Sequence, residues 1–208
     1  MSPTHFELLP RAFYAPAADV VAEALLGHWL IRQTPEGPRG GMIVETEAYL
    51  RDDSASHAYR GETARNRTMF GPPGHAYVYF IYGVHFCINA VCQARGVGEA
   101  VLIRAIAPEF GVEEMRHARS AASPAQLTNG PGKLCAALQI DRAQDGADFC
   151  DGESPVIIAR HPQAPRARRE FGPPARTKRI GITRSADLPL RFCLTGSPYL
   201  SRRPPRTR

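Results

Sequence analysis

Residues 41–49 read G-M-I-V-E-T-E-A-Y, a pattern that predicts a β-strand because β-branched and apolar residues follow two glycines. Side chains alternate across a strand, so two sets of residues point to opposite faces. One face carries Met42, Val44, Thr46 and Ala48, and the other carries Ile43, Glu45, Glu47 and Tyr49. The first set is suited to a core. The second brings an aromatic ring and two carboxylates, about 6–7 Å apart along the strand, to one face.

Two interpretations of the Glu45 and Glu47 pair follow from this pattern. Like charges this close are unfavourable unless a cation pairs with one of them or both serve a site. The simpler interpretation is the solvent-exposed face of a half-buried strand. The other is a functional site, and the rest of the sequence favours it.

The composition is that of a globular protein with a basic surface. The 208 residues carry a formal net charge of +6, and the positive charge is almost all arginine, since Lys133 and Lys178 are the two lysines. Arginine suits bidentate phosphate contact, so the charge favours a polyanionic partner. We expect one domain over residues 1–201 and a basic, disordered tail over residues 202–208.

Several classes of protein do not fit the sequence. No apolar run approaches the roughly 18–20 residues that span a bilayer, and the amino terminus lacks a signal-peptide pattern. We therefore expect no membrane association and a cytoplasmic location, with nucleoid association if the protein is bacterial. The five cysteines are scattered, and no C-x-x-C or H-E-x-x-H motif occurs, so we expect reduced thiols and no metal site.

Periodicity predicts a mixture of helices and strands in the rest of the chain. Helices are expected over residues 17–26, 110–119 and 134–138, and short strands over residues 28–33, 155–159, 180–182 and 190–194. Residues 161–179, rich in Pro, Arg and Ala, are expected to form an irregular basic loop. Residues 50–75 lack periodicity but contain His57, Arg65 and Arg67. A loop this long between two strong strands is typical of a functional segment.

Residues 76–93 predict a β-hairpin with Tyr82 and Gly83 at its tip. Both halves are rich in aromatic and β-branched residues, and Tyr77, Tyr79 and Ile81 share one face. A large ring at an exposed tip costs solubility, so Tyr82 is expected either to insert into a partner or to fold back on the domain. This pattern alone does not separate the two.

Two cationic residues lie close to predicted core elements. Residues 100–107 predict a buried strand interrupted by Arg104, which needs an anionic partner: a phosphate, or the carboxylate of Glu45 or Glu47. Lys133 ends N-G-P-G-K, a turn leading into the helix expected from residue 134, where free backbone amides can hold a phosphate. The spacing is not that of a nucleotide-binding P-loop.

The candidate functional groups are carboxylates, aromatic faces and arginines, without a metal-ligand pattern or a G-x-S-x-G motif. A carboxylate can activate water as a general base, while aromatic rings sandwich a planar, cationic group. Phosphate-binding arginines and a ring at a hairpin tip complete the set. Together they indicate an enzyme that flips a nucleobase and hydrolyses its glycosidic bond.

Ordered motifs cover most of the chain, from about residue 8 to residue 201. They are I-V-E-T-E-A-Y, His57, R-N-R-T-M-F-G-P-P-G, Y-V-Y-F-I-Y-G, L-I-R-A, N-G-P-G-K-L-C and R-F-C-L-T-G-S-P-Y. In this order they resemble the alkyladenine (mammalian-type 3-methyladenine) DNA glycosylase family. The resemblance implies a single-domain α+β fold with a curved antiparallel β-sheet, flanking helices and a protruding, DNA-inserting β-hairpin.

The resemblance also implies the activity. We expect a monomeric base-excision repair enzyme that acts on double-stranded DNA without a cofactor and removes purines of the 3-methyladenine, 7-methylguanine, hypoxanthine and ethenoadenine class. Cationic alkylated purines leave readily, whereas neutral hypoxanthine would depend more on a general base. A β-lyase step needs a nearby amine. Lys133 and Lys178 both lie outside the predicted core strands, so we expect a monofunctional enzyme.

Matching residues take on the family's roles in the base pocket. Glu47 would be the general base that activates the water attacking C1′. Tyr49 and His57 would stack on one face of the flipped base, and Tyr79 on the other. Asn89 would stand at the pocket wall and discriminate against the amino group of guanine.

Other matching residues would contact DNA. Tyr82 would be the wedge that fills the gap in the duplex, and Arg104 would contact a phosphate near the flipped nucleotide. The remaining DNA-binding residues are expected to be Arg65, Arg67 and Lys133. The chain departs from the family pattern at Val84 and His85, where relatives often carry a Met and a second aromatic, so the contacts that open the strands are expected to be weaker.

Two alternatives come from different functional classes. A hydrolase of free nucleosides or sugars could use the Glu45 and Glu47 pair, but it would need neither the tip aromatic nor the arginine-rich loop. A non-catalytic nucleic-acid-binding module could use the aromatics as stacking platforms. That module leaves Glu47 unexplained, because a carboxylate that faces DNA repels phosphate.

Overall fold

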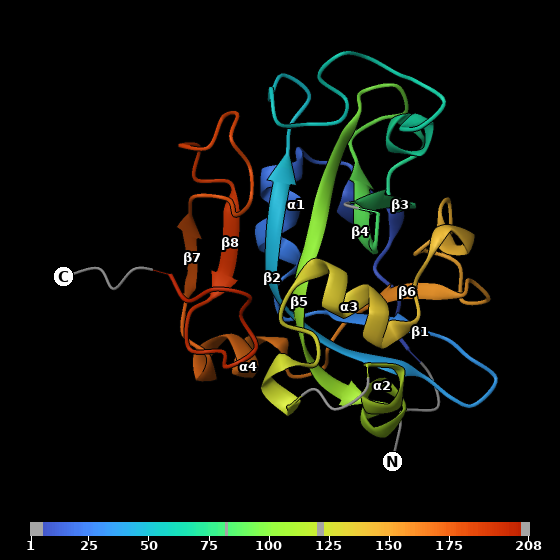
Figure 1. Cartoon of the computed structure of the whole chain (residues 1–208), viewed down its shortest axis with the longest axis vertical. Helices are drawn as coiled ribbons and strands as arrows, with labels where there is room; N and C mark the ends of the chain where they lie inside the picture. The colour runs from blue at the N-terminus through green and yellow to red at the C-terminus, as the bar shows by residue number, and fades with distance from the viewer. Residues whose placement is uncertain (1–5, 82, 120–122, 205–208) are drawn as a thin grey trace.

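The computed structural model describes residues 6–81, 83–119 and 123–204, and one antiparallel sheet organises them (Figure 1). Its strands are β1 (Trp29–Arg32), β2 (Arg39–Tyr49), β3 (Ala76–Ile81), β4 (His85–Cys92), β5 (Glu99–Phe110), β6 (Val156–Ala159), β7 (Pro174–Thr177) and β8 (Arg191–Leu194). Hydrogen-bonded neighbours run in the order β3-β4-β5-β2-β1-β6, and β8 pairs with both β2 and β7. The helices are α1 (Ala18–Leu25), α2 (Val112–Arg119), α3 (Pro131–Leu138) and α4 (Ala164–Glu170). The expected single-domain α+β class is confirmed.

β2 is the central strand because its two edges pair with three other strands. β5 pairs along nearly its whole length, while β1 pairs with residues 39–42 and β8 with residues 45–47 on the other edge. The strand bends between these two partners (Figure 1). A Cβ on Gly40 would lie 2.2 Å from the Leu30 oxygen, and one on Gly41 1.9 Å from the Ala107 oxygen. The two glycines therefore permit a backbone approach that no larger residue allows.

One face of β2 packs into the main core, as its apolar alternation predicts. Met42, Val44 and Ala48 are buried in this core, and Thr46 donates its hydroxyl hydrogen to the Ala22 carbonyl of α1 at 2.8 Å. α1 packs on β2, and α3 packs on β4 and β5. The opposite face of β2, with Glu45, Glu47 and Tyr49, is left to the candidate site.

β3 and β4 form the antiparallel pair expected within residues 76–93. Ile81 lies opposite His85, so residues 82–84 connect the strands. Tyr82, expected at the tip, lies outside the described residues. Its neighbours Phe80 and Val84 are 40% and 68% exposed. That this connection protrudes and enters DNA stays a prediction.

The sequence interpretation of residues 161–182 was wrong in two respects. The expected basic loop contains α4 and β7. α4 is held by Arg168, which donates to the carbonyls of Ala24 and Leu26 at the end of α1, a contact that local composition does not reveal. β7 pairs only with β8, and an edge strand tolerates Pro174 at its first position. The strand expected at residues 180–182 is irregular instead.

The remaining expected elements are present near their predicted positions. The three predicted helices correspond to α1, α2 and α3, and the strands predicted at 28–33, 155–159 and 190–194 correspond to β1, β6 and β8. In the part of the chain that the structure describes, no helix has the length and apolar character needed to cross a bilayer.

Candidate active site

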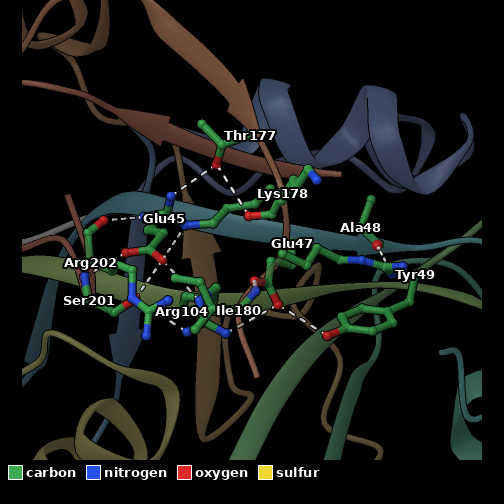
Figure 2. Close-up of polar contacts among 12 residues, drawn as sticks. Glu45, Glu47, Ala48, Tyr49, Arg104, Thr177, Lys178, Ile180, Ser201 and Arg202 are labelled. Carbon is green, nitrogen blue, oxygen red and sulfur yellow. Dashed lines mark hydrogen bonds and ion pairs between the residues drawn. The ribbon is translucent and has the colours of Figure 1, made fainter. Parts of the chain in front are cut away.

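Glu45 and Glu47 are both completely buried, and Arg104 of β5 lies between them (Figure 2). Arg104 Nε donates to Glu45 Oε1 at 2.9 Å, and Arg104 Nη1 donates to Glu47 Oε2 at 3.1 Å. The β2–β5 register shifts on both sides of Glu45, and bulges of this kind re-aim side chains next to active sites. The solvent-exposed interpretation of the pair is therefore wrong. One guanidinium compensates two neighbouring carboxylates.

Glu45 is enclosed by donors on every side. Arg191 Nε of β8 donates to its Oε1 at 2.8 Å. Ser201 donates both its backbone N–H and its hydroxyl hydrogen to Glu45 at 2.6 Å (Figure 2). Burial alone would raise the pKa of Glu45, but Arg104, Arg191 and Ser201 outweigh it and lower that pKa below its ordinary value. Glu45 is therefore a carboxylate anchor for two buried arginines, and its ionised form is favoured.

Glu47 is less strongly compensated. Its Oε1 accepts the Ile180 backbone N–H at 2.7 Å, and its Oε2 accepts the Tyr49 hydroxyl hydrogen at 3.1 Å besides Arg104 (Figure 2). Burial raises the pKa of Glu47 above its ordinary value, and Arg104 opposes the shift without cancelling it. A carboxylate with a raised pKa beside a cavity has the properties of a general base.

A pocket of about 420 Å³ lies in front of Glu47. The three donors that contact Glu47, namely Tyr49, Arg104 and Ile180, all line this pocket. Glu47 itself is fully buried behind them. These three residues therefore separate the Glu47 carboxylate from the pocket.

Aromatic rings form a large part of the pocket wall. His57 Nδ1 and the Tyr77 hydroxyl are 2.9 Å apart, and the His57 and Tyr79 rings meet edge to face with their centroids 4.5 Å apart. Burial and nearby Arg65 lower the pKa of His57, which keeps its imidazole neutral at physiological pH. Burial raises the pKa of Tyr77 to about 12 and that of Tyr79 further. These three rings are therefore polarisable and uncharged.

Strand register brings part of this wall into one row. Glu47 lies opposite Leu102, Leu102 opposite Asn89, and Asn89 opposite Tyr77, across β2, β5, β4 and β3. Asn89 is buried, lines the pocket and donates its amide hydrogen to the Tyr77 carbonyl at 2.9 Å. The carboxylate, the amide and the ring therefore project from the same face of the sheet.

The expected DNA-binding residues occupy three different environments. Arg65 and Arg67 are exposed outside the pocket, and Arg65 Nη2 donates to the Phe80 carbonyl at 3.2 Å, near the β3–β4 connection. Lys133, expected in the turn before the helix, lies in the first turn of α3, lines the pocket and donates to Asn129 at 2.9 Å. Arg104 is 6% exposed, and all three of its nitrogens donate to Glu45, Glu47 and Ser201. These contacts favour the carboxylate partners over the expected phosphate.

Sequence reasoning missed five residues that hold the site together. They are Tyr77, Asp53, Arg179, Arg191 and Ser201. Tyr77 carried a usable signal, because it shares a strand face with Tyr79. The others make contacts with residues that are distant in sequence. For Arg191, the sequence pattern showed only a cation at the start of an apolar strand. Among the described residues, no three His, Cys, Asp or Glu side chains are grouped as metal ligands.

Comparison with known proteins identifies the family. The family model described as methylpurine-DNA glycosylase matches residues 12–198. A relative from Methanoculleus marisnigri is 50% identical over 195 residues, which cover 94% of this chain and 99% of the relative. One from Carboxydothermus hydrogenoformans is 45% identical over 196 residues, covering 94% of this chain and 100% of the relative. Both are named "Putative 3-methyladenine DNA glycosylase". The resemblance noted in the sequence is confirmed: the chain belongs to the methylpurine-DNA glycosylase family and is a DNA glycosylase for alkylated bases.

Proposed function

We propose that this enzyme flips alkylated or deaminated purines out of duplex DNA and hydrolyses the N-glycosidic bond with water activated by Glu47. The substrates are purines of the 3-methyladenine, 7-methylguanine, hypoxanthine and ethenoadenine class. One observation carries the proposal: a buried carboxylate with a raised pKa lies directly behind an aromatic pocket. A pocket of about 420 Å³ is large enough for a single base.

Glu47 retains the capacity to bind one water molecule. A carboxylate accepts about four hydrogen bonds, and Ile180, Tyr49 and Arg104 supply three. In this proposal the fourth acceptor position takes the water that attacks C1′, and the residues that cover Glu47 move to let that water reach the buried carboxylate. Arg104 opposes the effect of burial on the pKa of Glu47 and so favours the ionised form that a general base needs.

The aromatic pocket is proposed to sandwich the base between Tyr49 and Tyr79. The edge-to-face contact between His57 and Tyr79 leaves no slot for a base between those two rings. We therefore assign His57 to the edge of the base, beside the ring of Tyr49. Asn89 completes the wall, and its amide is the group expected to reject the amino group of guanine.

DNA is proposed to lie over the β3–β4 connection, with Arg65, Arg67 and Lys133 at phosphates and Tyr82 as the wedge. Support comes from the exposed apolar side chains of Phe80 and Val84 on either side of residue 82. Insertion of such side chains between base steps is a common way to open a duplex. We propose that the enzyme acts as a cytoplasmic monomer, which is nucleoid-associated if the protein is bacterial.

We propose that no lyase step follows base removal. Water activated by Glu47 leaves an intact abasic strand, whereas a lyase needs an amine that forms a Schiff base with the sugar. Lys178 is paired with Asp187. Lys133 is the amine in the pocket wall, so borohydride trapping of the protein on abasic DNA is the direct check. No trapped adduct is expected.

The experiment that tests the function uses a duplex with one hypoxanthine. After incubation with the enzyme, one half of the reaction sample is treated with hot alkali and the other half is not. The proposal expects strand cleavage at hypoxanthine only after alkali. Cleavage without alkali would reveal a lyase, and an intact strand in both halves would exclude this base as a substrate.

A further inference from the structure

A buried ion pair lies against the ring of Tyr49. The guanidinium carbon of Arg179 is 4.6 Å from the ring centroid. Arg179 Nη1 pairs with Asp53 Oδ2 and also donates to the Ala48 carbonyl at 2.9 Å. The side chains of Arg179 and Asp53 are 0% and 1% exposed, so salt screens their charges little.

Tyr49 separates this ion pair from the pocket. Tyr49 is one of the residues that line the cavity, whereas Arg179 and Asp53 are not. A ring has two faces, and a guanidinium at 4.6 Å occupies one of them. The other face is the one left for the contents of the pocket.

We propose that the Asp53–Arg179 pair sets the pocket's preference between cationic and neutral damaged bases. This inference rests on the proposed function, in which the flipped base stacks on Tyr49. The pair acts through Tyr49, so both members are specificity-determining residues that do not touch the substrate. Their separate charges, and not only their packing, carry the effect.

The physical reason is electrostatic. The face of an aromatic ring attracts a cation through its quadrupole. A guanidinium on the far face opposes that attraction for a cationic base, because two positive charges then lie on opposite sides of one ring. The Asp53 carboxylate cancels most of the Arg179 charge, so the wild-type pocket keeps its affinity for cations. A neutral base is nearly indifferent to the pair.

The Asp53 loop also carries pocket residues, so a structural effect must be separated from a charge effect. Asp53 Oδ1 accepts the Ala55 N–H at 3.0 Å, and Ala55 and His57 line the pocket. Loss of this geometry would slow excision of every base. A charge effect instead changes the ratio between a cationic and a neutral substrate, and restoring neutrality reverses it.

The test compares single-turnover excision of 7-methylguanine, a cation in DNA, with excision of hypoxanthine, which is neutral. Asp53→Asn leaves the Arg179 charge uncompensated, and we expect the ratio of the two rates to fall about three- to tenfold from its wild-type value. The double variant Asp53→Asn/Arg179→Gln is neutral again, and its ratio should return to the wild-type value. An unchanged ratio in Asp53→Asn, or a ratio that stays low in the double variant, overturns the proposal.

A buried, unpaired guanidinium can prevent folding of Asp53→Asn. In that event Arg179→Gln, assayed at the same pH as the wild type, decides the matter. In this variant the rate of 7-methylguanine excision relative to hypoxanthine excision must rise. An unchanged or lower ratio overturns the proposal. Asp148→Asn is the matched control, because it breaks another Asp–Arg pair, with Arg11, and Asp148 does not line the pocket. Its ratio should equal that of the wild type.

Failure of this inference is distinguishable from failure of the proposed function. If the wild-type enzyme excises neither base from duplex DNA, the function is wrong. If it excises both bases but the ratio of the two rates does not change when the charges of Asp53 and Arg179 are altered, only the inference is wrong.

Discussion

The backbone N–H of Ile180 donates to Glu47 Oε1 at 2.7 Å, although 133 residues separate the two in sequence. This contact fixes one carboxylate oxygen without adding a charge. The N–H of Ile180 is directed at Glu47 and not at a neighbouring strand, and residues 180–182 are irregular. The irregular segment is therefore part of the hydrogen-bonded surroundings of Glu47.

Glu47→Gln should abolish excision of hypoxanthine while binding to damaged DNA persists. An amide cannot accept the proton from water, and loss of a general base commonly costs about 10²–10⁴-fold in rate. Single-turnover excision and a gel shift on the same duplex measure the two properties. A rate near that of the wild type would rule out Glu47 as the base.

Glu45→Gln should mainly cost stability. It leaves Arg104 and Arg191 buried without their shared carboxylate, a change that typically costs about 3–5 kcal/mol. Because the pKa of Glu45 is lowered in the folded protein, its contribution is present above the unfolded-state pKa and is lost as the pH falls through the folded-state pKa. Urea unfolding should therefore show a gap between wild type and variant that narrows on acidification. If Glu45→Gln is stable but inactive while Glu47→Gln is active, the two roles are reversed.

The pH profile of excision should show the raised pKa of Glu47. The base must be ionised, so the rate falls as the pH drops through this pKa, above the ordinary carboxyl value of about 4.5. Single-turnover rates on hypoxanthine across the acid range measure this limb, and circular dichroism at each pH confirms that the protein is folded. A midpoint at or below 4.5 would contradict the assignment.

Tyr82→Ser should weaken binding to a damaged duplex and slow base flipping, with a smaller effect on single-stranded or mismatched substrate. The wedge offsets an unstacking cost of a few kcal/mol, which is lowest where the base is already unpaired. Comparison of single-turnover rates on paired and unpaired hypoxanthine isolates this effect. Equal losses on both substrates would indicate a structural role for the ring.

Affinity for DNA should fall steeply with salt. With about four phosphate contacts from Arg65, Arg67, Lys133 and a neighbouring residue, the slope of log affinity against log salt should be about −3 to −4. Replacing exposed Arg67 by Gln should make the slope less steep by about one. Titration at several salt concentrations measures both values. A slope near zero would mean that the basic surface does not contact the DNA backbone.

Local pattern was sufficient to predict the central strand and much of the pocket. The alternation in residues 41–49 placed Glu45, Glu47 and Tyr49 on one face, and the aromatic run of residues 76–93 predicted a strand pair. Both signals arise from neighbours in sequence. The sequence also left Arg104 with two possible partners, and the choice between a phosphate and the carboxylates required the β2–β5 pairing.

The remaining features depend on contacts that no local pattern encodes. Arg191 and Ser201 meet Glu45 from 146 and 156 residues away. Arg168 stabilises α4 by reaching carbonyls of α1, so a Pro- and Arg-rich segment that resembles a loop is helical. The bulge around Glu45 is a matter of strand register, which composition does not fix.

The position of Ser201 has a consequence for the order in which the enzyme matures during translation. Glu45 leaves the ribosome long before two of its three donor residues, since Arg191 and Ser201 are synthesised 146 and 156 residues later. Until then Arg104 is its only partner among these three, so burial of the carboxylate is less fully compensated in the nascent chain. Completion of the hydrogen-bonded shell around Glu45 is therefore one of the last events of synthesis, because it requires residue 201.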